Sequence, residues 1–81
     1  LKAAGYKIAY TLPKGGHIAM AVYNLAGQRV RTVVDGHRAP GRYTAIWNEK
    51  DESGRQAASG LYLVRLATAS GSVTAKTMIL R

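Results

Sequence analysis

An alternation of apolar and polar residues with a period of two runs through almost the whole chain. In KIAYTL (residues 7–12) the side chains of Ile8, Tyr10 and Leu12 fall on one face, and GLYLVRL (residues 60–66) repeats the pattern. Successive side chains of a β-strand point to opposite faces, so this period predicts strands that bury one face. No segment shows the 3.6-residue period of an amphipathic helix. The chain is therefore predicted to be all-β.

Turn-forming residues separate these alternating runs. These separating segments are rich in Gly, Pro, Asn, Asp and Ser, which are the residues that tight turns favour. They are Pro13 to Gly16, the NLAG tetrad at 24–27, DGHRAPG at 35–41, NEKDESG at 48–54 and SGS at 70–72. Residues 18–34 are expected to form a hairpin around NLAG, and Asp51-x-x-Gly54 is expected to close a second turn. Six or seven short strands with turns about every 8–12 residues indicate an antiparallel β-sandwich.

The alternation also predicts which side chains form the core. Trp47 is expected on the inward face, where a β-sandwich commonly buries a tryptophan. Leu61 and Leu63 point opposite to Tyr62 and Val64, so they are expected to lie under a loop or to form an apolar surface strip that a partner covers. The last strand has a rival face made of Val73, Ala75, Thr77 and Ile79. The expected core is Ile8, Tyr10, Leu12, Ile18, Met20, Val22, Val30, Val33, Trp47, Tyr62, Val64, Leu66, Met78 and Leu80.

The length of 81 residues is that of one small domain. We expect residues 1–5 to be the remnant of a linker and residues 6–81 to form the domain, as an excised or processed piece of a longer protein. The absence of cysteine excludes disulfides, a thiolate zinc site and a cysteine nucleophile. No apolar run approaches the roughly 18 residues of a membrane span, so the chain is not expected to cross a membrane.

Twelve Lys and Arg against four Asp and Glu give a net charge of +8. Such a field attracts acidic polysaccharide, lipopolysaccharide, nucleic acid or a negatively charged protein. The basic residues are scattered, which is typical of a solvated surface rather than of a dedicated anion site. Nucleic acid is not an expected partner, because the sequence has no recognition helix, no aromatic RNA-binding strand and no basic run.

Residues that carry chemistry do not assemble into a catalytic motif. His37 and Asp35 are close in sequence, but no serine has a nucleophile motif around it, so no enzymatic activity is expected. Asn48, Asp51 and Glu52 offer oxygen ligands for calcium, yet their spacing matches no EF-hand loop and a plain turn is favoured. No metal site and no cofactor are expected.

Tyr23 is the aromatic residue expected to point outward from a strand. Flat aromatic faces suit sugar rings, so Tyr23 is a candidate for glycan contact. A carbohydrate-binding accessory module of a glycoside hydrolase is therefore one alternative function. It requires a second aromatic ring coplanar with Tyr23 on the surface.

Taken in order, three segments resemble the Ig-like domain first described in the flagellar hook-capping protein, the FlgD-type Ig-like family. IAYTLPKGGHIAMAVYNLAGQRVRTVV (8–34) resembles its opening, PGRYTAIWNEKDESGRQAASGLYLVRL (40–66) its continuation and KTMILR (76–81) its close. The sequence departs from the family pattern at Asn24 and Asn48, where acidic residues are common, and at Arg81, where Lys is more usual. The resemblance implies an Ig-like or fibronectin III-like antiparallel β-sandwich of about seven short strands.

The resemblance extends to C-terminal domains of secreted bacterial proteins that the type IX secretion system reads. It implies a non-catalytic C-terminal module that acts in sorting and cell-surface attachment, binds secretion or cell-envelope proteins and reaches the extracellular surface through the periplasm. A scaffold or assembly domain of the hook-cap type is the other alternative. The residues implied to bind the partner are Ser59, Gly60, Tyr62, Lys76, Met78, Leu80 and Arg81, with strand addition at the last strand as the expected mode.

Overall fold

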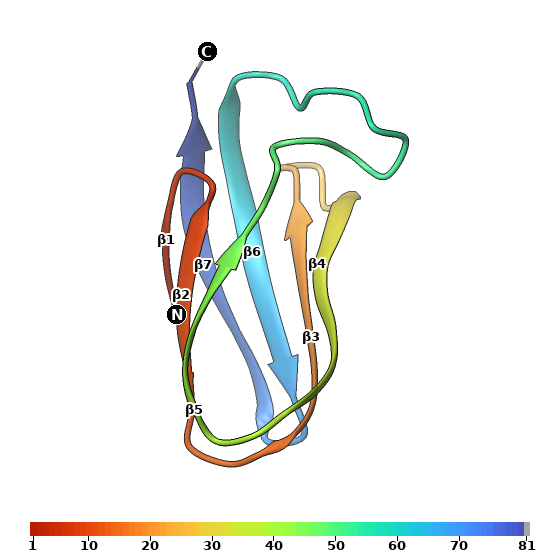
Figure 1. Cartoon of the computed structure of the whole chain (residues 1–81). Helices are drawn as coiled ribbons and strands as arrows, with labels where there is room; N and C mark the ends of the chain where they lie inside the picture. The colour runs from red at the N-terminus through yellow and green to blue at the C-terminus, as the bar shows by residue number, and fades with distance from the viewer. Residues whose placement is uncertain (81) are drawn as a thin grey trace.

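The computed structural model describes residues 1–80, which form two antiparallel β-sheets (Figure 1). One sheet has the order β1-β2-β5 and the other the order β4-β3-β6-β7. The predicted all-β sandwich is therefore confirmed. The strands are β1 (Lys2–Ala4), β2 (Lys7–Leu12), β3 (Gly16–Tyr23), β4 (Arg29–Arg38), β5 (Gly41–Ile46), β6 (Gly60–Thr68) and β7 (Gly71–Ile79).

The position of β4 decides which kind of Ig-like sandwich this is. In an immunoglobulin constant domain the fourth strand pairs with the fifth. Here β4 pairs with β3, from Gly16 opposite Arg38 to Tyr23 opposite Arg29. The three-plus-four division that results lies within the Ig-like or fibronectin III-like sandwich that the family resemblance implied.

The core lies between the two sheets and is built from the inward side chains that the alternation predicted. Trp47 is 2% exposed, and its ring meets that of Tyr62 edge to face with centroids 5.4 Å apart. The indole Nε1 donates to the carbonyl oxygen of Lys50 at 2.9 Å, so its polar atom is satisfied. The large, fully buried side chains are Trp47, Ile8, Ile18, Met20, Ile79, Val22 and Val64.

The predicted face of the last strand is wrong. Met78 is 53% and Leu80 79% exposed, whereas Thr77 and Ile79 of the rival face are buried. The register explains the choice, because Thr77 lies opposite the inward-facing Tyr62 of β6. The hydroxyl of Thr77 donates to the carbonyl oxygen of Gly5 at 2.8 Å, which satisfies a polar group inside the core.

Strand β4 is longer and less regular than expected. Residues 35–38, predicted to be loop, continue the strand. The pairing with β3 shifts register between Met20 and Ala21 and again between Val22 and Tyr23. The two shifts leave Val33 and Val30 as extra residues in β4, and both valines are half-buried against the core. Bulges of this kind bend and twist an edge strand.

The first residues also pair in the sheet. Residues 1–5 were predicted to be a linker, but Lys2–Ala4 form β1 and pair with Lys7–Ala9 of β2. Three residues are too few for an alternating pattern to be visible, which explains why the sequence did not show this strand. Residues 1–80 contain no helix long and apolar enough to cross a membrane.

Candidate functional site on the outer face of the four-stranded sheet

Apolar side chains from three neighbouring strands meet on the outer face of the four-stranded sheet. Tyr23 of β3 lies opposite Leu63 of β6, and Leu61 of β6 lies opposite Met78 of β7. Residues paired in this way share a face, and it is the face away from the buried Val22, Tyr62 and Val64. We call Tyr23, Leu61, Leu63 and Met78 the outer-face patch.

Basic side chains surround the outer-face patch. Lys76 is paired with Leu63, Arg29 is paired with Tyr23, and Arg65 is two residues along β6 from Leu63. The three cations are exposed, whereas the patch is half-buried apart from the 53% exposed Met78. An apolar centre with a charged margin is the usual anatomy of a protein-binding surface.

Strand β7 forms one edge of this sheet. Its hydrogen-bonded neighbour is β6, and β1 of the other sheet lies beside it, where the inward Thr77 hydroxyl donates to the carbonyl oxygen of Gly5 in the turn after β1. The predicted site residues Lys76, Met78 and Leu80 alternate with the buried Thr77 and Ile79 and are exposed. Arg81 lies outside the described residues.

The opposite edge of the sheet is covered by the polar loop between β5 and β6. The amide of Glu52 donates to the carbonyl oxygen of Val30 at 3.0 Å, and the Glu52 carboxylate accepts from the amide of Thr32 at 2.9 Å. Arg31 Nη1 also donates to the carbonyl oxygen of Asp51 at 3.1 Å. The two edges of the four-stranded sheet therefore differ, since part of β4 is already bonded.

The predicted segment Ser59, Gly60 and Tyr62 lies where the chain enters β6. The hydroxyl of Tyr62 donates to the carbonyl oxygen of Ala58 at 2.6 Å, and the residue is buried. A tyrosine near the start of this strand that bonds backbone a few residues upstream is the tyrosine corner of Ig-like sandwiches. Tyr62 thus packs the core, and Leu61 beside it faces outward into the patch.

Two turns of the same design lie beside this corner. The Oδ1 atoms of Asn24 and Asp51 each accept backbone amides two and four residues ahead. Gly27 and Gly54 occupy the fourth positions with φ of 83° and 89°, which glycine adopts without strain. Both predicted turns are confirmed. The Ser53 hydroxyl, with further help from the Arg55 and Ser53 amides, lowers the pKa of Asp51 below its ordinary value.

Asp35 contacts His17 rather than His37. His17 Nε2 lies 2.9 Å from Asp35 Oδ1, and both side chains are well exposed. Among residues 1–80, no three or more His, Asp or Glu side chains are grouped to hold a metal ion. Within that range the aromatic ring pairs are Tyr10 with Tyr43, His17 with His37 and Trp47 with Tyr62. Tyr23 is not a member of these ring pairs.

The sequence matches the family model of the FlgD Ig-like domain over residues 3–72. The chain belongs to this family. No individual curated protein and no solved structure matches the chain significantly. The matched residues include Tyr23, Leu61 and Leu63. The residues Lys76, Met78 and Leu80 come after the matched range.

Proposed function

We propose that this FlgD Ig-like domain is a non-catalytic docking module of a larger secreted or cell-surface bacterial protein. It acts in sorting and surface attachment by binding secretion or cell-envelope proteins at the outer face of the four-stranded sheet. The observation that carries this proposal is the outer-face patch, which includes Met78 of the edge strand β7 and has a basic margin.

The chemistry of this face favours a protein partner with an acidic, extended segment. An edge strand offers backbone groups to an added strand, and its alternate side chains select the partner. On β7 those side chains are Lys76 and Met78, and Leu80 follows the end of the strand. Lys76, Arg29 and Arg65 complement negative charge, which raises the association rate and disfavours basic competitors.

A cargo fusion with matched variants tests this proposal. Residues 1–81 are fused to a passive cargo in a host with a type IX secretion system, and surface cargo is measured. We expect the unmodified fusion to reach the surface and the Lys76→Glu/Met78→Glu fusion to stay in the periplasm. The control is Lys7→Glu/Ile46→Glu, a cross-strand pair on the other sheet whose Ile46 is 56% exposed, close to the 53% of Met78.

The control fusion should reach the surface, because it carries the same change of charge and apolarity away from the outer-face patch. Circular dichroism and Trp47 fluorescence establish that both variants are folded. An unmodified fusion that remains in the periplasm contradicts the sorting role. Equal display of the two double variants contradicts the assignment to this face.

A second candidate is an assembly domain of the hook-cap type, and the family match favours it. The same face would then bind another structural subunit instead of a secretion component. A photo-cross-linking residue at Met78 in the parent protein separates the two. Cross-links to a secretion component support sorting, and cross-links to a subunit of an extracellular assembly support the scaffold role.

A further inference from the structure

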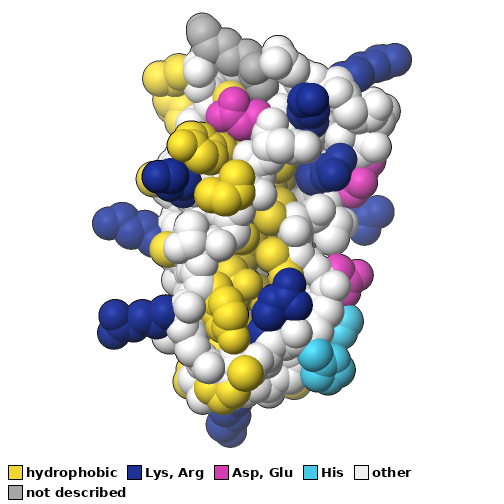
Figure 2. Space-filling view, in the orientation of Figure 1, with side chains coloured by type: hydrophobic (Ala, Val, Ile, Leu, Met, Phe, Trp, Pro, Cys, Tyr) yellow, Lys and Arg dark blue, Asp and Glu magenta, His cyan; other side chains and the backbone are white. Residues whose placement is uncertain are grey.

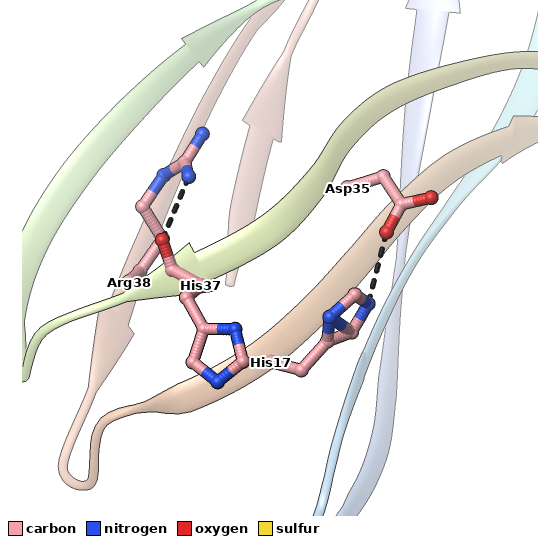
Figure 3. Close-up of polar contacts among 4 residues, drawn as sticks. All are labelled: His17, Asp35, His37 and Arg38. Carbon is pink, nitrogen blue, oxygen red and sulfur yellow. Dashed lines mark hydrogen bonds and ion pairs between the residues drawn. The ribbon is translucent and has the colours of Figure 1, made fainter.

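Two histidines and an aspartate lie together on the outer face of the four-stranded sheet, at the end of the hairpin away from the patch. His17 of β3 is directly opposite His37 of β4, and Asp35 is opposite Ala19. The imidazole centroids are 5.7 Å apart, with the ring planes at 84°. Figure 3 shows both rings and the carboxylate on the same side of the hairpin, and Figure 2 shows the two histidines together at the surface.

The aspartate orients one of the two rings. His17 Nε2 lies 2.9 Å from Asp35 Oδ1, so this nitrogen carries the proton that the carboxylate accepts. In the neutral ring the lone pair is then on Nδ1, which in Figure 3 is on the side of the ring that faces His37. A carboxylate that holds the distal nitrogen is how proteins fix the tautomer of a metal-binding histidine.

The spacing of the rings suits one shared ion. Two imidazoles bound tetrahedrally to zinc at about 2.1 Å have ring centres roughly 5 Å apart. The observed 5.7 Å is reached from that value by small rotations of exposed side chains. Imidazole is a good ligand for Zn²⁺, Cu²⁺ and Ni²⁺ and a poor one for Ca²⁺ or Mg²⁺.

We propose that His17 and His37 form a surface binding site for a divalent transition-metal ion such as Zn²⁺, with Asp35 as the residue that positions His17. Within residues 1–80 no third protein ligand joins them, so the remaining coordination positions are open to water or to a donor from another molecule. Arg38 Nη1 donates to the carbonyl oxygen of His37 at 2.9 Å and places a positive charge nearby, which moderates the affinity. This site is independent of the docking function proposed above.

Titration with Zn²⁺ tests the site directly, on a chain that carries no polyhistidine tag. Calorimetry at pH 7.5 should give one ion per chain, and the imidazole NMR resonances of His17 and His37 should both shift. His17→Ala and His37→Ala should each weaken binding at least about tenfold, and Asp35→Asn by about tenfold, in the range typical of groups that orient a ligand. Thr74→Ala, exposed on the same face, is the control and should bind normally.

The substituted positions are exposed, and far-UV circular dichroism checks that each variant is folded. Absence of saturable binding, or unchanged affinity in both histidine variants, overturns the site. Unchanged affinity in Asp35→Asn overturns the positioning role of Asp35.

Discussion

Two tyrosines in this domain make the same hydrogen bond in different surroundings. Tyr62 donates to the carbonyl oxygen of Ala58 at 2.6 Å, and Tyr43 donates to that of Ala39 at 2.7 Å, each four residues upstream. The Tyr62 bond is partly buried, whereas the Tyr43 bond is exposed to water. A lost bond costs more where water cannot replace it, so the pair isolates the contribution of burial.

Removal of each hydroxyl should therefore have unequal effects. Tyr62→Phe keeps the ring against Trp47 but leaves the Ala58 carbonyl without its partner, and should lower the free energy of unfolding by about 1–2 kcal/mol. Tyr43→Phe should change it by less than about 0.5 kcal/mol. Urea denaturation at equal m-values measures both. Similar losses in the two variants would contradict a specific role for the tyrosine corner.

The turns that begin at Asn24 and Asp51 have the same hydrogen-bond pattern. Asn24 and Asp51 accept equivalent amide bonds, but Asp51 also accepts from the Ser53 hydroxyl at 2.7 Å. That hydroxyl is the main cause of the lowered pKa of Asp51. A carboxyl whose pKa is lower in the folded state stabilises the fold above its unfolded pKa, and the stabilisation is lost as the pH falls through the folded value.

Asp51→Asn should remove this dependence on pH while the turn persists, as the natural Asn24 turn shows. The unmodified domain should lose stability below about pH 4, the ordinary range of an aspartate, and the variant should lose less over the same interval. Thermal unfolding from pH 6 to 2.5 measures the difference. Parallel curves for the two proteins would show that Asp51 does not couple the turn to pH.

At the scale of whole strands, the features that the sequence predicted correctly are those set by interactions between residues close together in the chain. The turns at Asn24–Gly27 and Asp51–Gly54 are local and were predicted correctly. The face of the last strand was not, because Met78 and Leu80 are more apolar than Thr77 and Ile79, and it is pairing with the distant β6 that turns Thr77 and Ile79 inward. Tyr23, Leu61 and Leu63 were each noted as outward-facing. Their meeting with Met78 depends on the strand order β3-β6-β7, which no local pattern contains.

The charge of the whole molecule is strongly positive but unevenly placed. Three of the four acidic residues lie in the loop between β5 and β6, namely Glu49, Asp51 and Glu52. Over the rest of the surface, few negative charges therefore offset the positive ones. We expect weak binding to an anionic polymer such as dextran sulfate at low salt. Fluorescence anisotropy should show its loss as salt increases, because the screening length falls to about 3 Å near 1 M. Binding that persists there would indicate a specific anion site.

The loop between β5 and β6, which Glu52 bonds to β4, also limits where a further strand can be added to the four-stranded sheet. A sheet with two free edges can accept a neighbour on each side and so propagate into a fibre. Here the Val30–Thr32 stretch of one edge is already bonded within the chain, and β4 is bulged at Val30 and Val33. This part of the edge cannot accept another strand. The proposed strand addition at β7 would therefore not be matched by a second addition along Val30–Thr32, which disfavours growth into a fibre.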